Sequence, residues 1–118
     1  MGIQTIHHNG KEIAIIDYTV CNTHEEMMRT LEEAADYFKR SPKKLLTVTD
    51  FTNTFVNSEF MEKAKIYGKE VFKDKRDKGA LIGVSRLQKI LLSGYNLFAK
   101  DKLVPFNTRE EALKYLTS

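Results

Sequence analysis

Short apolar runs alternate with longer amphipathic segments along this chain, and this alternation limits the possible folds more than any other feature. In the amphipathic segments, apolar residues recur at three- and four-residue steps, which is the spacing of one helix face. The element order predicted from this pattern is β-β-α-β-α-β-α-β-α. Strands that alternate with helices favour a parallel sheet joined by right-handed crossovers. The sequence therefore predicts an α/β domain with a mixed, mostly parallel sheet.

Turn and capping residues set the boundaries of these elements. Asn9-Gly10 is a strong hairpin signal, because both central positions of a type I′ turn need a positive φ. Capping boxes that begin at Thr23 and Thr108 open the first and last helices, and Pro105 indicates an edge strand. Strands are predicted at residues 3–8, 11–19, 45–50, 80–84 and 103–106. The second and third helices are predicted at 58–73 and 86–100, and a charged connection at 74–79.

The length and the cysteine count point to a small cytoplasmic protein. A chain of 118 residues suits one domain, residues 1–118, that can hold a core without metal or disulfide staples. The single Cys21 cannot form an internal disulfide, which is typical of a reducing cytoplasm. We find no signal-peptide pattern, and no apolar run approaches the roughly 20 residues that span a bilayer. We therefore expect no stable membrane insertion.

Positive charge is concentrated at residues 62–78, which hold seven basic and four acidic side chains. Such a patch could attract an acidic protein, a phosphorylated ligand or nucleic acid. The acids are interleaved with the bases, however, which favours a solvated helix face. Nucleic-acid readers usually show a purer basic stripe with stacking aromatics, so we expect no nucleic-acid partner.

The segment that follows the third strand is the best candidate for a site. A buried strand ends in Asp50, a polar loop with apolar anchors follows, and Ser58 is placed to cap the next helix. A phosphate on Ser58 would meet free N–H groups at a helix N-terminus. The favoured alternative is that Ser58 is an ordinary N-cap. The candidate surface comprises Asp50, Phe51, Thr52, Asn53, Thr54, Phe55, Asn57 and Ser58.

Two aspartates, Asp17 and Asp50, each close a predicted strand. If those strands are parallel, both carboxylates lie at the edge where open α/β sheets bind ligands. A paired acid could serve as a general acid–base or hold a cation. The favoured alternative is that both acids stabilise turns of their own loops. His7, His8 and His24 do not have the spacing of a metal set, and we expect no catalytic residue, metal or cofactor.

The third helix carries two apolar lines. Leu87, Ile90, Leu91, Gly94 and Phe98 are predicted to face inward. Leu92, Tyr95 and Ala99 form a second line, offset around the axis. A helix that is apolar on two sides is either deeply buried or contacts a partner. We expect Leu92 and Tyr95 to lie on a partner surface or at a shared pocket edge, with homodimerisation the simplest case.

Several local strings resemble the STAS-like family, also called SpoIIAA-like, and most closely its stand-alone STAS/Sec14-related members of unassigned function. The resemblance is carried by residues 15–18, 45–52, 81–84 and 106–112. It implies a mixed sheet with helices packed against it. In the anti-sigma factor antagonists of this family, a partner kinase phosphorylates a Ser in an Asp-Ser pair. Asn57-Ser58 lies near that position. The loop that precedes it is one residue shorter than in those antagonists, and Asn57 replaces the Asp.

These observations favour a non-enzymatic regulatory or protein-interaction module, with the loop at 51–57, Ser58 and the third helix as its surface. The alternative is a carrier or sensor of a small apolar ligand or lipid. The adaptable lining would then come from Met27, Met28, Met61, Phe51, Phe55 and Phe60. An enzyme that uses Asp17 and Asp50 is least favoured. A closed core with an exposed apolar patch would favour the interaction module, and a cavity under the second or third helix would favour the carrier.

Overall fold

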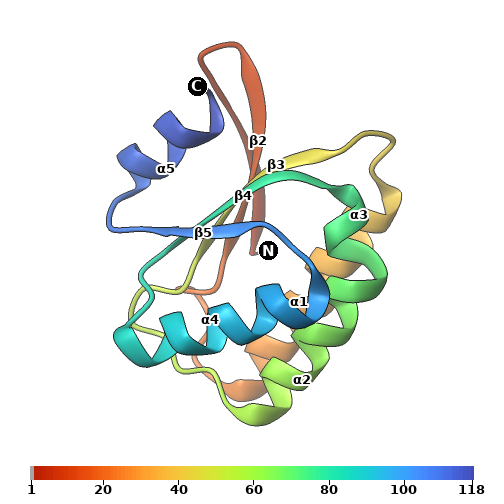
Figure 1. Cartoon of the computed structure of the whole chain (residues 1–118), viewed down its shortest axis with the longest axis vertical. Helices are drawn as coiled ribbons and strands as arrows, with labels where there is room; N and C mark the ends of the chain where they lie inside the picture. The colour runs from red at the N-terminus through yellow and green to blue at the C-terminus, as the bar shows by residue number, and fades with distance from the viewer. Residues whose placement is uncertain (1) are drawn as a thin grey trace.

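Five strands form one twisted sheet, in the order in which they occur along the chain (Figure 1). The computed structural model describes residues 2–118. The strands are β1 (Ile3–His8), β2 (Lys11–Asp17), β3 (Leu45–Asp50), β4 (Arg76–Ile82) and β5 (Leu103–Phe106). β1 pairs antiparallel with β2, and every later pair is parallel. The predicted mixed, mostly parallel sheet and its element order are therefore confirmed.

Both edges of the sheet follow from local sequence. Asn9 and Gly10 have φ values of 51° and 77°, as a type I′ hairpin turn between β1 and β2 requires. At the opposite edge, Pro105 lies in β5, where a missing N–H costs no inner ladder bond. Both sequence predictions are confirmed.

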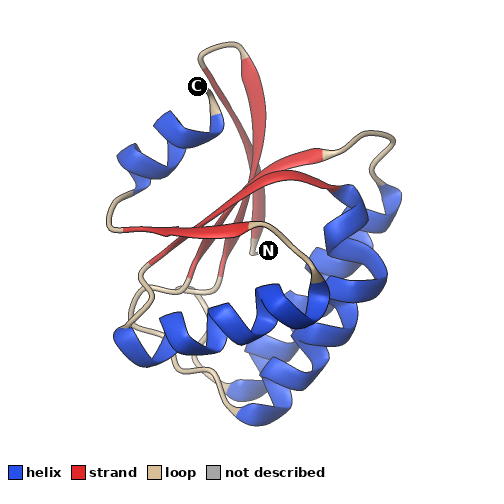
Figure 2. Ribbon diagram, viewed as in Figure 1, coloured by secondary structure: helices blue, strands red, loops and turns tan. Residues whose placement is uncertain are grey.

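Helices cover both faces of the sheet (Figure 2). They are α1 (His24–Arg40), α2 (Ser58–Tyr67), η1 (Gly68–Phe72), α3 (Lys73–Lys75), α4 (Arg86–Ala99) and α5 (Arg109–Leu116). The η1 segment is a π-helical turn between α2 and α3, and the backbone stays helical across both junctions. α1, α2 and α4 lie on one face of the sheet, while α5 packs on the other against β3, β4 and β5.

Alternating strand residues divide the core into two parts. On β2, Ile16 faces the large core beneath α1, α2 and α4, while Ile13 and Ile15 face α5. Side chains point to opposite faces of a strand with a period of two. Because both faces are covered, the inner strands are apolar on both sides, as their continuous apolar runs predict.

The structure corrects the predicted start of the fourth strand. β4 begins at Arg76, so residues 76–79 of the expected charged connection lie within the strand. The basic run does not form one surface either. Lys69 lies over the Phe98 ring of α4, whereas Lys78 lies over the Tyr115 ring of α5, on the opposite face of the sheet. Within residues 2–118, no helix is long and apolar enough to cross a membrane.

Candidate functional site

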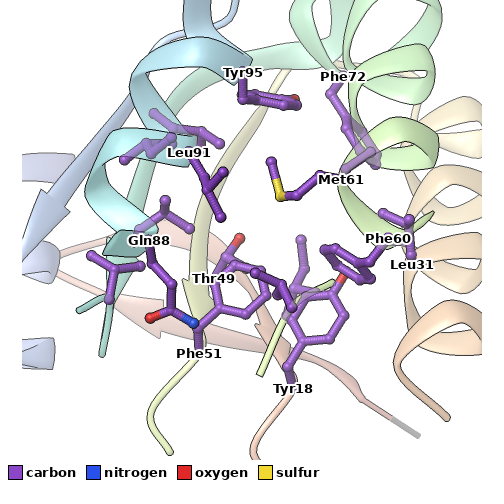
Figure 3. Close-up of a pocket in the computed structure, with 18 of the residues that line it drawn as sticks. Tyr18, Leu31, Thr49, Phe51, Phe60, Met61, Phe72, Gln88, Leu91 and Tyr95 are labelled. Carbon is purple, nitrogen blue, oxygen red and sulfur yellow. The ribbon is translucent and has the colours of Figure 1, made fainter. Parts of the chain in front are cut away.

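An apolar cavity of about 90 Å³ lies between α2, α4 and the sheet (Figure 3). Its wall includes the apolar side chains Ile16, Leu31, Val56, Phe60, Met61, Phe72, Leu81, Val84, Leu91, Leu92 and Leu103. Among the described residues that line it, the polar side chains are Thr49, Arg76, Gln88 and two tyrosines, Tyr18 and Tyr95. A concave, mostly apolar surface with few polar groups is the usual form of a small-molecule site.

Three aromatic rings build one wall of this cavity. Tyr18 follows β2 and stacks on Phe51, which follows β3, with ring centres 4.6 Å apart and planes 7° apart. Phe60 of α2 meets both rings edge-on, at 5.5 Å and 6.1 Å. Offset stacks and edge contacts of this kind stabilise an aromatic cluster beyond simple burial. The ends of two parallel strands and the start of α2 are thereby held together at the site.

The loop at 51–57 is attached to the beginning of α4. The Gln88 amide donates to the Thr54 carbonyl oxygen at 3.2 Å. The same side chain accepts from the Ser85 N–H at 2.8 Å, and Ser85 Oγ accepts from the Gln88 N–H, which completes a capping box. Gln88 therefore connects the helix cap to the loop at the cavity. Phe51 contributes to the lining, but Phe55 is exposed.

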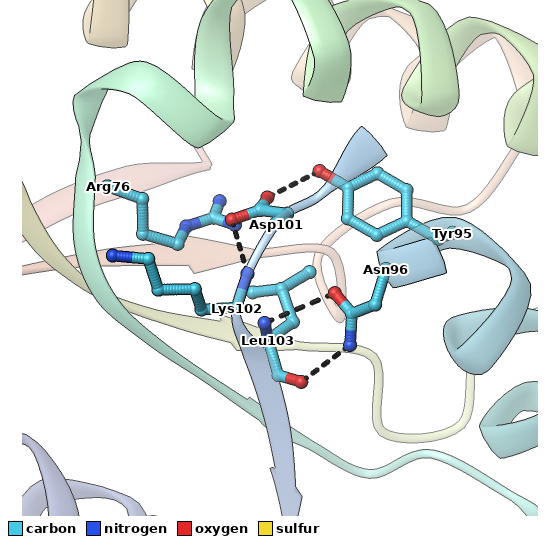
Figure 4. Close-up of polar contacts among 6 residues, drawn as sticks. All are labelled: Arg76, Tyr95, Asn96, Asp101, Lys102 and Leu103. Atoms are coloured by element: carbon cyan, nitrogen blue, oxygen red, sulfur yellow. Dashed lines mark hydrogen bonds and ion pairs between the residues drawn. The ribbon is translucent and has the colours of Figure 1, made fainter. Parts of the chain in front are cut away.

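A buried ion pair secures the other end of α4 (Figure 4). The Arg76 guanidinium donates to Asp101 Oδ2 at 2.7 Å, and Tyr95 Oη donates to the same oxygen at 2.6 Å. Burial is the main reason that the pKa of Tyr95 lies well above its ordinary value, so its hydroxyl keeps the proton that it donates. Arg76 and Asp101 neutralise each other's charge at this end of the cavity, while Arg76 Nε has no hydrogen-bond partner among the described residues.

Further bonds attach α4 to β5 beside this ion pair. The Asn96 amide donates to the Leu103 carbonyl at 2.9 Å and its oxygen accepts from the Leu103 N–H at 3.2 Å. Asp101 Oδ1 accepts from the Lys102 N–H at 2.8 Å. The chain between α4 and β5 is therefore held by side chains at both of its ends.

Asp17 and Asp50 lie side by side in the β2–β3 register, but each is engaged in its own turn. Asp17 Oδ1 accepts from the N–H and hydroxyl of Thr19, and Asp50 Oδ1 accepts in the same way from Thr52. This geometry confirms the turn-stabilising alternative. Among residues 2–118, no group of three His, Cys, Asp or Glu side chains could hold a metal ion.

The N-cap of α2 is Asn57, so the prediction that Ser58 caps the helix is wrong. Asn57 Oδ1 accepts from the Phe60 N–H at 2.9 Å, and its amide contacts His24 Nδ1 at 3.1 Å. Asn is as good an N-cap as Ser, and at this register Phe60 turns into the core. Ser58 occupies the first helical position and is exposed. Its role as a phosphoacceptor stays a prediction.

The predicted orientation of α4 is wrong for Leu87, Ile90 and Phe98, which are exposed, while Leu91 lines the cavity as expected of an inward residue. Leu92, Tyr95 and Ala99 are buried, and Leu92 and Tyr95 line the cavity, which is the expected pocket edge and not a partner surface. The exposed line contains Leu87 at 66%, Ile90 at 68%, Leu97 at 75% and Phe98 at 50% exposure. Both lines have helical spacing, and hydropathy alone does not distinguish them. The bond of Tyr95 to Asp101 and that of Asn96 to Leu103 fix the rotation of the helix.

Sequence reasoning missed three residues that shape the site. Gln88 carried a usable signal, because Ser85 and Gln88 have the spacing of a capping box. Arg76 and Asp101 carried none, since they are 25 residues apart and each sits in a charged stretch that reads as solvated.

Comparison with known proteins supports the fold. No family model matches the sequence, and no curated protein matches it at a significant level. An uncharacterized protein of the DUF3478 family from Shewanella loihica PV-4, with a SpoIIAA-like fold, matches with a TM-score of 0.72 and 16% identity, over 97% of this chain and 91% of that one. An anti-sigma-factor antagonist (STAS) domain protein from Planctomyces limnophilus matches with a TM-score of 0.62 and 18% identity, over 98% of each chain. At such identities the likeness concerns the fold and not the activity. The chain therefore has the SpoIIAA-like, or STAS-like, α/β fold that its sequence resembles.

Proposed function

We propose that this protein is a non-enzymatic binding module that carries or senses a small apolar molecule in the cavity between α2 and α4. The observation that carries this proposal is the apolar lining of the cavity, with its three packed aromatic rings. Dry apolar cavities take up apolar guests of matching size, because burial removes the guest from water. The cysteine count agrees with a cytoplasmic location, which is part of the same proposal.

The wall nearest α2 and α4 suits a ligand of variable shape. Met61 and Leu91 project into the cavity from these two helices (Figure 3). Methionine is unbranched and polarisable, so it adapts to different apolar surfaces. The attachment of the loop to α4 depends on single hydrogen bonds from Gln88, which an entering ligand can break at small cost.

A cavity-filling variant tests this function. Toluene should raise the melting temperature of the wild-type protein, because it binds only the folded state. Met61→Trp places a larger side chain in the cavity and should abolish that shift. Ile66→Trp is the matched control, because Ile66 is on α2 but half exposed and outside the lining. A toluene shift of equal size in all three proteins would place the binding elsewhere and contradict the proposal.

The exposed line of α4 favours a second candidate, a regulatory interaction with a protein. Leu87, Ile90, Leu97 and Phe98 form an apolar stripe along one helix. The helix carries Arg86 and Lys89 but no acid, and Lys69 lies 5.3 Å from the Phe98 ring centre. The partner that fits is therefore a protein surface with an apolar centre and an acidic rim. Like charges on two copies disfavour a homodimer through this stripe.

Ile90→Ser tests this second candidate, with Lys114→Ser on the far face as its control. A partner captured from the host is identified, purified and rebound in solution. Binding should weaken in Ile90→Ser and at high salt, and stay unchanged in the control. Sedimentation of the protein alone tests whether the stripe instead binds a second copy of this chain. A dimer that dissociates in Ile90→Ser would assign the stripe to a second copy and overturn the acidic partner.

A further inference from the structure

Two hydroxyl groups enter the apolar cavity from the sheet side, at the ends of β2 and β3 (Figure 3). Tyr18 is 3% exposed and Thr49 is 7% exposed, so both lie well inside the protein. Among the described residues, neither hydroxyl has a hydrogen-bond partner, and neither oxygen is fully enclosed, because both residues line the cavity. The pKa of Tyr18 is raised well above its ordinary value, mainly by burial. Tyr95 provides the contrast, since its hydroxyl is bound to Asp101.

Unpartnered hydroxyls in such a place point to a guest that supplies the partner. A buried polar group without a hydrogen bond costs free energy, and native structures rarely leave one. Atoms that line a cavity can be satisfied by whatever fills it. A purely apolar guest would leave both hydroxyls unsatisfied, whereas a guest with a hydroxyl, carbonyl or N–H group would satisfy at least one.

The charges around the cavity limit the guest further. The guanidinium of Arg76 and the carboxylate of Asp101 are paired with each other, and their side chains are 3% and 1% exposed. An ionised guest would lose its hydration and find no free opposite charge. The cavity of about 90 Å³ limits the guest to a single ring at most, since an apolar cavity of roughly 150 Å³ holds benzene.

We infer that the cavity takes a small uncharged molecule with an apolar ring-sized body and one hydrogen-bonding group, which Tyr18 and Thr49 recognise. This inference rests on the proposed ligand-binding function and adds the chemical class of the ligand. It makes the two hydroxyls the residues that determine specificity, and the apolar wall the source of affinity.

Toluene and p-cresol test this inference, because they differ by one hydroxyl on the same ring and methyl group. Dissociation constants are measured by NMR titration for the wild-type protein, Tyr18→Phe and Thr49→Val. Loss of one hydrogen bond should weaken p-cresol binding by about tenfold in at least one variant, while toluene binding is unchanged or tighter. The charged analogue p-toluate should bind more weakly than p-cresol to the wild type.

Thr47→Val is the matched control. Thr47 precedes Thr49 by two residues on β3, is fully buried and also has an unpartnered hydroxyl, but it does not line the cavity. Loss of the Thr47 hydroxyl should leave the ratio of p-cresol affinity to toluene affinity unchanged.

The remaining outcomes separate the two proposals. If both compounds bind and neither Tyr18→Phe nor Thr49→Val changes their ratio, water satisfies the hydroxyls and this inference is wrong, while the proposed function stands. Tighter binding of p-toluate than of p-cresol would overturn the uncharged class. If none of the three compounds binds to the wild type, the proposed function and this inference fail together.

Discussion

Arg76 and Asp101 form a buried ion pair, with Nη1 and Oδ2 2.7 Å apart, that joins the start of β4 to the segment after α4. The rings of Phe38 and Phe72 lie 5.1 Å and 5.4 Å from the guanidinium carbon, which adds cation–π contacts with two rings that also pack on each other. Tyr95 donates to the same carboxylate oxygen. One acid thus connects a strand and a helix through two residues that line the cavity, Arg76 and Tyr95.

Asp101→Asn should lower the free energy of unfolding by about 3–5 kcal/mol, because it leaves the buried Arg76 charge without its counter-ion. Urea unfolding measures this loss. The matched control is Glu12→Gln, which breaks the exposed pair between Lys43 and Glu12 at 2.9 Å. That loss should be much smaller, because water screens an exposed ion pair. Equal losses of unfolding free energy in Asp101→Asn and Glu12→Gln would contradict a stabilising role of the buried pair between Arg76 and Asp101.

The two buried tyrosines predict a loss of stability in alkali. Burial raises the pKa of Tyr18 and Tyr95 in the folded protein, whereas in the unfolded chain it stays near 10. Above about pH 10, the unfolded chain releases these protons and the folded protein does not. The stabilisation that comes from the raised pKa of the two tyrosines is therefore complete below about pH 10 and falls as the pH rises further.

Tyr18→Phe isolates this effect from the titration of lysines. Its unfolding free energy should fall less steeply than that of the wild type between about pH 10 and 11, by up to about 1.4 kcal/mol per pH unit. Urea unfolding at several pH values measures both slopes. Parallel slopes would show that Tyr18 ionises as easily in the folded protein as in the unfolded chain.

The cap of α2 distinguishes two adjacent residues. Asn57→Ala should cost about 1 kcal/mol, because it removes the acceptor of the Phe60 N–H. Ser58→Ala should change stability by less than about 0.5 kcal/mol, because the side chain is exposed and caps nothing. Thermal and urea unfolding of both variants measure the difference. A larger loss in Ser58→Ala would restore the original sequence prediction.

Ser58 is accessible enough to be modified, and this prediction concerns regulation rather than stability. A phosphate there would lie beside Glu59, whose carboxylate is 2.7 Å from His24 Nε2. Mass spectrometry of protein from its own host should locate a phosphate on Ser58, and Ser58→Asp should weaken partner binding with the fold intact. Unmodified protein under all growth conditions would remove Ser58 as a switch.

The parts of this fold that depend on local chemistry were predictable. Asn9-Gly10 and Pro105 specify their positions through φ and a missing N–H, which neighbours do not alter. The orientation of α4 was not predictable, because both of its faces are apolar and the choice depends on the distant Asp101. The cavity was not predictable either. Nothing in the sequence distinguishes Thr49 and Tyr18 from other residues near strand ends, and they line a cavity only because α2 and α4 pack over them.

Two glycines with different surroundings provide the last prediction. A Cβ on Gly68, where the π-helical turn begins, would lie 2.5 Å from Tyr95 Oη. Tyr95 cannot retreat without breaking its bond to Asp101, so Gly68→Ala should cost about 1–3 kcal/mol through overpacking. Gly94 is exposed within α4 and a Cβ there would meet nothing within 4 Å. Gly94→Ala should therefore stabilise the protein by up to about 1 kcal/mol.

A double-mutant cycle checks the cause of the Gly68 effect. In a Tyr95→Ala background the three side-chain atoms that would lie 2.5, 2.7 and 2.8 Å from the new Cβ are all absent, so the added methyl group should cost less than in the wild type. Residues in contact usually couple by about 0.5–3 kcal/mol, and urea unfolding of the four proteins measures this coupling. A cost that is the same in both backgrounds would mean that the π-helical turn, rather than the contact with Tyr95, requires the glycine.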